Sequence, residues 1–574
     1  MTAAEARVPA RTAPAPWPLW LQDGVVLGVM VVLAAACIVY EYLLSHYAGR
    51  VLGMMEHAIF AMIGVMIVSM GLGSLAARRI RDPDTGFLVV ELSLAVLGAS
   101  GILLIAGAVA FAQDLPVIIA QNFSLPRDAV PTGALTAAVD RAAGTVPYLV
   151  GAAIGVLIGM EIPLIARVRE ALYRRHLTHN TGTVYGFDYV GAGLGAAIFI
   201  TVLLALPPEQ VAVGVAAVNL TAGTAFLALR WRQVSARRTL AAAHALVLLA
   251  LLLIGTRSGT WHALLEDSLY QDHVILAEDT DFQHITVTGR TTGTGMEHRL
   301  YLNGRLQFCS CDEVIYHSML VAPPLLAAAR TDDILLIGGG DGLALRNMLH
   351  WEPRRVTVLE LDRRMVSLFS ERQAGGANAP LIALNESSFD DPRVNVRFGD
   401  AFNTAQALLA EGRRFDAIVV DLPDPSHPDL NKLYSVRFYA LLRRLLTGDG
   451  ALAVQSTSPF HARDAFLTVG VTLEAAGFGR VAPYRANVPS FGEWGWTLAA
   501  PDGAPLSTRI AQSRQSIPAQ SWATPDLIEA AFAFPKNFLA RADDLTPNTV
   551  SGNAMYRLHQ DAWAREDITV TGQP

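Results

Sequence analysis

The chain has 574 residues, too many for one domain, and its net charge of −7 at pH 7 offers no basic surface to nucleic acid. Hydrophobic residues make up 52% of the chain, and they gather in long runs before about residue 256. Residues 260–574 have the composition of ordinary globular domains, so we expect a multi-pass α-helical membrane domain over 1–256 followed by soluble domains.

Seven apolar runs in the first part reach about 18 residues or more, the length that a membrane-spanning helix needs. The first run is too long for the core of a signal peptide and lacks a small-residue cleavage site after a short core. Small residues recur in GLGS (71–74) and GAGLGAA (191–197), where they would let helix backbones approach closely. The runs cover 24–44, 57–77, 86–112, 146–166, 183–206, 209–229 and 239–256.

Arginines cluster in alternate loops, which face the cytoplasm according to the positive-inside rule. The clusters follow the second, fourth and sixth runs, at 78–81, 167–175 and 230–238. A seventh run that crosses the membrane would therefore carry the soluble part out of the cytoplasm. That run has only about 18 residues and is interrupted by His244, so it could instead lie along the membrane interface.

Four acids lie near the ends of these runs, namely Glu41, Glu91, Glu161 and Asp188. Ionisable residues inside membrane segments are candidates for function. Several of these acids lie on the arginine-rich side, where they could pair with arginines as structural groups. Two interpretations therefore stay open, ion pairing at the interface and the binding of a cation.

A small β-domain is predicted over 262–312, because HVILAED, HITVTGR and HRLYLNGRLQF alternate apolar and polar residues. The Asn303-Gly304 pair between two such runs is a strong hairpin signal. Cys309 and Cys311 would point the same way on a strand. So short a loop disfavours a disulfide and a metal would need more ligands, so we expect reduced structural thiols.

From residue 313 to about 500, apolar strands alternate with helices, which predicts a parallel sheet covered on both faces. Sheets of this kind bind ligands at the carboxyl ends of their strands. Residues 501–574 form a C-terminal extension. The predicted strands are 334–338, 355–361, 394–399, 415–421 and 451–456, and the predicted helices are 314–329, 343–351, 363–374, 401–412, 435–446 and 462–477.

Acids stand at the carboxyl ends of four successive strands in this pattern. Asp341 follows the glycine turn of LLIGGGDG (335–342), Glu360 nearly ends the second strand and Asp400 follows the third. Asp421 ends the fourth strand, and Asp424 follows three residues later. One such acid would usually be a solvated loop residue, but five at corresponding strand ends indicate a ligand site. An acid at the end of the second strand suits a ribose diol, because its carboxylate can accept hydrogen bonds from both hydroxyls.

Six motifs follow one another in this region: LYQD (269–272), LNGRLQFCSCDEVIYHSMLVAPPL (302–325), LLIGGGDG (335–342), LELD (359–362), GDAF (399–402) and DLPDPSHPDLNKLYSVRFY (421–439). Together they resemble the spermidine synthase family, the polyamine aminopropyltransferases. The resemblance covers about 262–500, and the whole chain is similar to the membrane-attached bacterial branch of that family. It implies a β-domain followed by an α/β Rossmann-like domain of methyltransferase type.

The resemblance implies roles for individual residues. Asp421 matches the catalytic carboxylate, Glu360 lies at the ribose and Asp400 near the adenine of the donor, decarboxylated S-adenosylmethionine. Positions that match donor contacts are Gln271, Leu302, Gly338, Asp341, Glu360 and Asp400. Positions that match the aminopropyl and acceptor sites are Gln307, Tyr316, His317, Asp421 and Asp424.

The aspartate in the glycine turn has a physical explanation in this setting. Ordinary S-adenosylmethionine carries an ammonium and a carboxylate on its tail, whereas the decarboxylated donor carries only the ammonium. Asp341 would attract the cation and repel the carboxylate, which favours aminopropyl transfer over methyl transfer. Asp421, assisted by Tyr316, could then take the proton of the acceptor amine, and Asp424 could hold its distal ammonium.

Three positions depart from the family pattern and bear on the acceptor. DLPDP lacks the small polar residue that usually follows the first aspartate, and Ala401 replaces a common glycine. In VPSFGEWGW (488–496), Pro489 stands where an acceptor-contacting tyrosine is expected. Trp494 and Trp496 are predicted to be packing residues rather than ligands.

Two classes of function remain open. The first is an aminopropyltransferase of the cell membrane that converts putrescine, or a related amine, to spermidine and methylthioadenosine without a metal or redox cofactor. The second is a polyamine- or nucleoside-binding membrane transporter or sensor with a weakly active or inactive synthase-like domain. The expected partners are the amine and the lipid bilayer, and a homo-oligomer is compatible with the sequence. Because the donor comes from cytoplasmic metabolism, a cytoplasmic synthase domain is expected.

Overall fold

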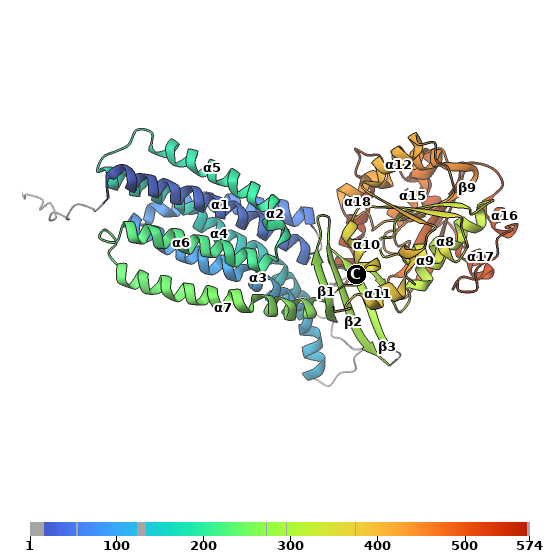
Figure 1. Cartoon of the computed structure of the whole chain (residues 1–574), viewed down its shortest axis with the longest axis horizontal. Coiled ribbons are helices and arrows are strands. Elements are labelled where there is room, and N and C mark those ends of the chain that lie inside the picture. Colours follow the sequence, from blue (N-terminus) through green and yellow to red (C-terminus); the bar gives the residue numbers. More distant parts are fainter. Residues whose placement is uncertain are drawn as a thin grey trace, which may run out of the picture. The chain divides into compact units, whose positions relative to one another are not determined.

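The computed structural model describes residues 17–52, 55–122, 134–270, 272–293, 295–373 and 375–570. They belong to two compact units, Met1–Leu269 and Tyr270–Pro574, which Figure 1 colours from blue to red along the chain. The boundary therefore falls later than the predicted end of the membrane domain at 256, because the last helix of the first unit runs on to Tyr270.

The described residues of the first unit form helices joined by turns. Within the described residues, seven of its helices are long and apolar enough to cross a membrane. Five of the predicted runs lie wholly inside one of these helices, whereas the runs 57–77 and 183–206 end shortly after the helix that contains most of their residues. The helices are α1 (Leu19–Leu52), α2 (Met55–Ala76), α3 (Pro83–Asn122), α4 (Ala134–Tyr173), α5 (Asn180–Thr201), α6 (Pro208–Leu229) and α7 (Arg237–Tyr270), with short 3₁₀ turns η1 (Ala77–Arg79) and η2 (Leu203–Ala205).

The seventh helix is much longer than the sequence suggested. α7 has 34 residues, which corresponds to about 51 Å at the usual helical rise, against about 30 Å of bilayer hydrocarbon. The segment after the apolar run continues the helix because its apolar side chains keep helical spacing, as at Trp261, Leu264 and Leu265. The length of α7 therefore gives no reason against a crossing, and whether the helix crosses the membrane or lies along the interface stays a prediction.

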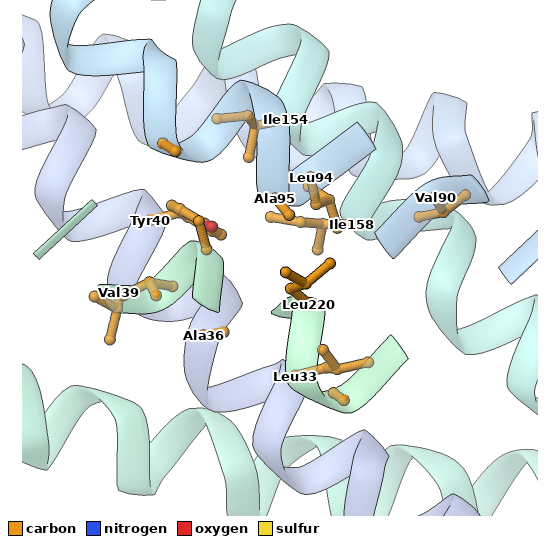
Figure 2. Packing of buried hydrophobic residues seen from close by; sticks show 14 of the residues in the cluster. Leu33, Ala36, Val39, Tyr40, Val90, Leu94, Ala95, Ile154, Ile158 and Leu220 are labelled. Carbon is orange, nitrogen blue, oxygen red and sulfur yellow. The ribbon is translucent and has the colours of Figure 1, made fainter. Parts of the chain in front are cut away.

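Small residues allow close helix contacts, as predicted. A Cβ at Gly73 of α2 would collide with the Val156 carbonyl of α4, and one at Gly191 of α5 would collide with the Val31 carbonyl of α1. Between the helices, apolar side chains such as Leu33 of α1 pack into one buried core (Figure 2).

A four-stranded antiparallel sheet opens the second unit, in the order β1-β2-β3-β4. The expected hairpin joins β3 to β4, and Asn303 and Gly304 both have positive φ, 50° and 79°. The strands are β1 (His273–Asp279), β2 (His284–Thr292), β3 (Gly295–Leu302) and β4 (Arg305–Cys309).

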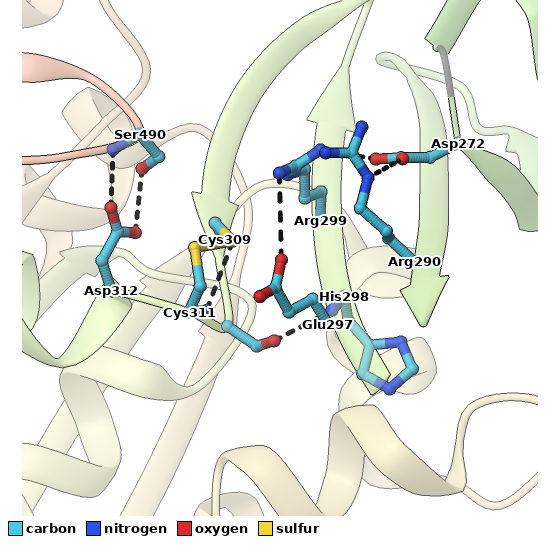
Figure 3. The surroundings of a disulfide bond; sticks show 10 residues. Asp272, Arg290, Glu297, His298, Arg299, Cys309, Cys311, Asp312 and Ser490 are labelled. Atoms are coloured by element: carbon cyan, nitrogen blue, oxygen red, sulfur yellow. Dashed lines mark hydrogen bonds and ion pairs between the residues drawn. A yellow bond between two sulfur atoms is a disulfide. The ribbon is translucent and has the colours of Figure 1, made fainter. Parts of the chain in front are cut away.

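The expectation of two reduced thiols is wrong, because Cys309 and Cys311 form a disulfide (Figure 3). β4 ends at Cys309 and the chain turns there, so the two Cα atoms lie 5.1 Å apart, within the usual range for a disulfide. The bond precedes Asp312, whose carboxylate accepts from the backbone N–H and the hydroxyl of Ser490 at 2.6 and 2.9 Å. This region thereby joins the start of α8 to the loop that contains Pro489.

A seven-stranded sheet forms the centre of the second unit, in the order β10-β11-β9-β8-β5-β6-β7. Its first five strands in the chain are parallel, as predicted, and β10 and β11 add an antiparallel hairpin that the sequence reading missed. The strands are β5 (Asp333–Gly338), β6 (Arg355–Glu360), β7 (Val394–Phe398), β8 (Phe415–Asp421), β9 (Leu446–Gln455), β10 (Arg480–Val488) and β11 (Gly492–Ala500).

Helices cover both faces of this sheet (Figure 1). Ile334 and Leu336 of β5 pack with α8 and α9, whereas Leu335 and Ile337 pack into the opposite core with α12, α14 and α15. The four-stranded sheet packs against α10 and α11. The helices are α8 (Glu313–Ala327), α9 (Leu343–Leu349), α10 (Arg363–Ser370), α11 (Ala379–Leu384), α12 (Ala401–Ala410), α13 (Pro428–Asn431), α14 (Val436–Leu445) and α15 (Arg463–Ala475), with η3 (Ser388–Asp390) and η4 (Lys432–Tyr434).

The C-terminal extension packs on the same sheet. Asn548 anchors its last helix, because its amide donates to the carbonyls of Asn431 and Tyr434 and its oxygen accepts from the backbone N–H of Ala554. The start of α18 is thereby held beside the segment that follows β8. The elements are α16 (Leu506–Ala511), α17 (Pro525–Ala531), η5 (Leu539–Asp544) and α18 (Ala554–Val570).

Candidate active site

The glycine turn after β5 lies directly against the end of β8. Gly338 has φ 80°, and a Cβ there would collide with the Asp421 carbonyl, so only glycine fits. A Cβ on Gly340 would lie 2.9 Å from Oε2 of Glu360. The strand ends that carry Asp421 and Glu360 therefore flank the turn that carries Asp341.

Asp421 and Tyr316 form the central polar pair of this site. The Tyr316 hydroxyl, from α8, donates to Oδ1 of Asp421 at 2.9 Å. Burial raises the pKa of Asp421 to about 6, although the charge of His317 and the Tyr316 bond act in the opposite direction. Burial and the neighbouring Asp421 raise the pKa of Tyr316 well above its usual value, so the tyrosine keeps its proton and orients the carboxylate.

A buried ion-pair network lies behind this pair. Arg346 donates to both carboxylate oxygens of Glu313 at 3.0 Å, and Glu313 also accepts from Nδ1 of His317 at 2.9 Å. Although burial opposes the change, His317 and Arg346 lower the pKa of Glu313 to about 2. Burial likewise opposes charge on His317, but Glu313, Asp341 and Asp421 outweigh it and raise the pKa of His317.

Asp341 completes the negative side of this network. Its Oδ1 accepts from the backbone N–H of Leu343 at 2.9 Å, and Asn385 donates to its main-chain carbonyl at 2.9 Å. Burial raises the pKa of Asp341, and the charge of His317 opposes that rise. With His317 protonated, three carboxylates (Glu313, Asp341, Asp421) face two cations, so the group favours one added positive charge.

Glu360 and Asp400 lie at the ends of the next two strands. Glu360 accepts from the backbone N–H groups of Leu361 and Asp362 at 2.7 and 3.0 Å, and burial raises its pKa to about 7. Asp400 caps α12 through the N–H of Asn403 and pairs with Lys432 at 2.7 Å. Burial acts against ionisation there, but Lys432 lowers the pKa of Asp400.

Asp424 is held by three side chains from distant parts of the chain. Gln455, at the end of β9, donates to Oδ1 at 2.6 Å, while Thr457 and His559 reach Oδ2 at 3.2 Å each. Since a carboxylate only accepts, the Nε2 atom of His559 carries the proton of that bond. Burial opposes ionisation, but His559 and Gln455 outweigh it and lower the pKa of Asp424.

The structure brings together most of the residues that the family resemblance selected. Gly338, Asp341, Tyr316, His317 and Asp421 surround the glycine turn. Glu360, Asp400 and Asp424 lie at adjoining strand ends.

For three residues that the family resemblance selected, the structure does not show a contact with the acids of the site. Leu302 is the last residue of β3. Gln307 of β4 donates to the carbonyls of Arg305 and Leu306, and among the described residues no bond joins it to the acids of the site. Gln271 lies outside the described residues, and its role stays a prediction.

Sequence reasoning missed the supporting residues. Gln455 stands at the carboxyl end of β9, where the strand-end rule could have found it. Glu313 lies inside a quoted motif but had no assigned role, and its partner Arg346 is on a different helix. His559 had no local signal, because only the folding of α18 against the sheet brings it to Asp424.

The two tryptophans are packing residues, as predicted. Trp496 is completely buried and its ring lies 5.5 Å from that of Tyr316. Trp494 packs against Phe491 at 4.9 Å. In the turn that contains Pro489, the aromatic ring of Phe491 therefore packs against Tyr316, where the family pattern has a tyrosine with its hydroxyl.

Fold and site together define a Rossmann-like α/β protein whose strand-end acids favour a cationic ligand. A family model described as the spermine/spermidine synthase domain matches residues 313–509. The chain is 48% identical over 550 residues to a polyamine aminopropyltransferase of Shewanella oneidensis, over 95% of this chain and 96% of that one. It is 35% identical to polyamine aminopropyltransferase 1 of Streptomyces coelicolor, over 93% of each chain.

Among solved structures, a spermidine synthase from Thermotoga maritima has 21% identity and a TM-score of 0.39, over 48% of this chain and 88% of that one. The relatives with high identity decide the assignment. The chain belongs to the polyamine aminopropyltransferase family. It is an aminopropyltransferase, and its co-substrate is decarboxylated S-adenosylmethionine. The alignments also include the helical unit, since they cover nearly the whole chain.

Proposed function

We propose that the enzyme transfers the aminopropyl group to putrescine or a closely related diamine, giving spermidine and methylthioadenosine. The observation that carries the proposal is the Tyr316–Asp421 pair at 2.9 Å, beside the glycine turn with Asp341. A buried carboxylate with a raised pKa suits a base that must take a proton from an amine. A binding protein without turnover would have no use for a base prepared in this way.

The proposed reaction is a direct displacement. An amine nitrogen attacks the propyl carbon beside the sulfonium, the C–S bond breaks and its electron pair leaves with methylthioadenosine. Asp421 takes the proton of the attacking amine, because a protonated amine has no free electron pair. Asp424 holds the distal ammonium of the diamine, which fixes how far the acceptor reaches.

The acceptor is identified by supplying purified enzyme with decarboxylated S-adenosylmethionine and one amine at a time. The panel contains diamines of three to five carbons, spermidine and a monoamine, and mass spectrometry detects the product. Putrescine is expected to react fastest, because the retained Asp424 recognises a second ammonium. Equal rates with the monoamine would contradict that role of Asp424, and a faster triamine would replace putrescine as the acceptor.

His559→Ala is expected to raise the KM for the acceptor amine about tenfold, since a hydrogen bond to a charged group contributes about 1.5–3 kcal/mol. The KM of the donor should hardly change, because His559 contacts Asp424 and not the glycine turn. Steady-state kinetics with each substrate varied in turn separate the two effects.

His559→Gln retains an N–H donor and should recover part of the acceptor affinity. Arg557→Ala is the matched control, because Arg557 lies on the same helix with an exposed side chain. Equal losses of donor and acceptor affinity in His559→Ala would indicate general damage to the fold instead of loss of a support for Asp424.

We also propose that the helical unit spans the cell membrane and that the synthase unit lies in the cytoplasm. The length and composition of the helices support the first part. The second part rests on the supply of donor, which is a product of cytoplasmic metabolism.

A C-terminal fusion to a cytoplasm-active reporter should therefore be active in cells, and a fusion to a periplasm-active reporter should be silent. Activity of the periplasmic reporter alone would overturn the cytoplasmic placement. That result would agree with the arginine clusters, with an α7 that crosses the membrane and with the Cys309–Cys311 disulfide.

A further inference from the structure

Polar side chains from several helices meet inside the apolar core of the helical unit. Glu91 of α3 and Asn219 of α6 are both 0% exposed. Their neighbours Val90, Leu94 and Leu220 are apolar and belong to the core in Figure 2. Such groups are costly in an apolar interior unless each of them has a partner.

Glu91 has only part of the bonding that its burial requires. Its Oε2 accepts from the side-chain amide of Asn219 at 3.0 Å. Its Oε1 and the Oδ1 of Asn219 are buried, and neither atom has a hydrogen-bond partner among the residues that the structure describes. Both of these oxygen atoms are hydrogen-bond acceptors, so what the two side chains lack is a hydrogen-bond donor.

His244 of α7 contributes a third buried acceptor. Its Nδ1 lies 2.8 Å from the Leu240 carbonyl, which can only accept, so Nδ1 carries the ring proton. In the neutral imidazole Nε2 is then an acceptor, and it is buried and has no hydrogen-bond partner among the described residues. A Cβ on Gly223 would lie 3.0 Å from this Nε2 and 3.4 Å from Cβ of Glu91, so the two side chains border the same point.

A second buried carboxyl group lies within electrostatic reach. Glu161 of α4 contacts Sγ of Cys37 of α1 at 3.6 and 3.7 Å through its two oxygens, and the charges of Glu91 and of the half-buried Asp188 of α5 act on it. The charges of Glu91 and Glu161 also act on the buried Tyr40 of α1.

The acids of the helical unit that do have basic partners are different ones. Asp23 pairs with Arg169, and Asp84 with Arg230, each at 2.7 Å. In the described part of the chain, no ion pair joins Glu91 or Glu161 to an arginine, contrary to the structural interpretation of these two acids.

The missing component is therefore a positively charged donor, and the packing limits its size. A metal ion needs several ligand atoms that converge on one point. Among the described residues, the His, Cys, Asp and Glu side chains that lie close enough together for this are Glu297, Cys309 and Cys311, and none of them belongs to this core. An alkylammonium needs a cavity, whereas Glu91 and Asn219 are fully enclosed. A proton needs neither, because an O–H on Glu91 satisfies one orphaned acceptor and can point to another.

We propose that Glu91 and His244 form a proton-binding site inside the helical unit, with Glu161 and Cys37 as a second proton-carrying pair beside it. The inference rests on the proposed membrane placement and is independent of aminopropyl transfer. Binding adds one proton to Glu91 Oε1, which forms an O–H bond and removes one negative charge. The site thereby holds one proton inside the helical unit, bound between buried acceptors.

The test uses the full chain in lipid nanodiscs and infrared spectroscopy of carboxyl groups. At a pH well above 7, Glu360 and Asp421 are ionised, since their pKa values are about 7 and about 6. A protonated carboxyl C=O band should persist there in the wild type and should shift in D₂O. Glu91→Gln should remove part of this band, and His244→Asn should shift its position.

Glu170→Gln is the matched control, because Glu170 lies on α4 but bonds His176 away from the buried group. It should leave the band unchanged. Absence of a D₂O-sensitive band in the wild type would overturn the proposal without any variant. An unchanged band in a folded Glu91→Gln would overturn it as well.

A second arm measures thermal unfolding of the wild type with sodium, calcium or putrescine. No stabilisation that depends on Glu91 is expected. If one of these cations stabilises the wild type but not Glu91→Gln, the site binds that cation, and the assignment to a proton is wrong.

Discussion

Replacing Asp421 with Asn is expected to lower kcat/KM by about 10²- to 10⁴-fold, the usual contribution of a positioned general base. Asn has nearly the same shape and can still accept from the Tyr316 hydroxyl, which lies 2.9 Å from Oδ1 of Asp421. It cannot take a proton from the attacking amine. Donor affinity, measured by calorimetry, should stay close to that of the wild type, because the glycine turn meets the backbone carbonyl of residue 421.

The pH profile gives a second measurement of the same group. Asp421 can accept a proton only when it is ionised. The value of log kcat/KM should therefore rise with pH through about 6, the raised pKa of Asp421, and the contribution of Asp421 should be constant at higher pH. Tyr316→Phe removes a bond that opposes the rise, so its acid limb should move to higher pH. An Asp421→Asn enzyme with near-normal turnover, or with the wild-type acid limb, would exclude Asp421 as the base.

The sheet of the synthase unit could be predicted because its strands are buried on both faces. In β5, Ile334 and Leu336 face one core and Leu335 and Ile337 face the other, which produces an unbroken apolar run in the sequence. The β3–β4 hairpin was equally visible, because Asn303 and Gly304 are residues that tolerate positive φ. These signals are local, and the sequence contains them directly.

Other features depend on contacts that no local pattern records. The Cys309–Cys311 disulfide depends on the chain turning after β4, where a straight strand was expected. The length of α7, by contrast, was open to prediction, because apolar side chains keep helical spacing beyond its apolar run.

The same contrast holds for the site. Its acids were predictable because parallel strands bring their carboxyl ends to one edge of the sheet. The partners that lower the pKa of the site's acids could not be predicted in this way. Arg346, which pairs with Glu313, and His559, which pairs with Asp424, come from separate helices that only the folded chain brings to the site.

Replacing Asp341 with Asn is expected to reduce the preference for decarboxylated S-adenosylmethionine over S-adenosylmethionine by about tenfold or more. The expectation uses the contribution of a hydrogen bond to a charged group, about 1.5–3 kcal/mol. Asn can still accept from the backbone N–H of Leu343, which lies 2.9 Å from Oδ1 of Asp341, so the turn should keep its shape. What disappears is one negative charge from a buried group that otherwise holds three carboxylates against His317 and Arg346.

Loss of that charge acts on the two donors in opposite directions. The decarboxylated donor loses an attraction for its ammonium, whereas the ordinary donor also loses a repulsion of its carboxylate. Binding constants of both donors, measured by calorimetry for the wild type and the variant, give the ratio directly. Asp333→Asn is the control, because it removes a carboxylate from the opposite end of the same strand, where Asp333 pairs with Arg354. If the ratio in Asp341→Asn equals that of the wild type, donor discrimination must come from the shape of the pocket, and the charge in the glycine turn has another purpose.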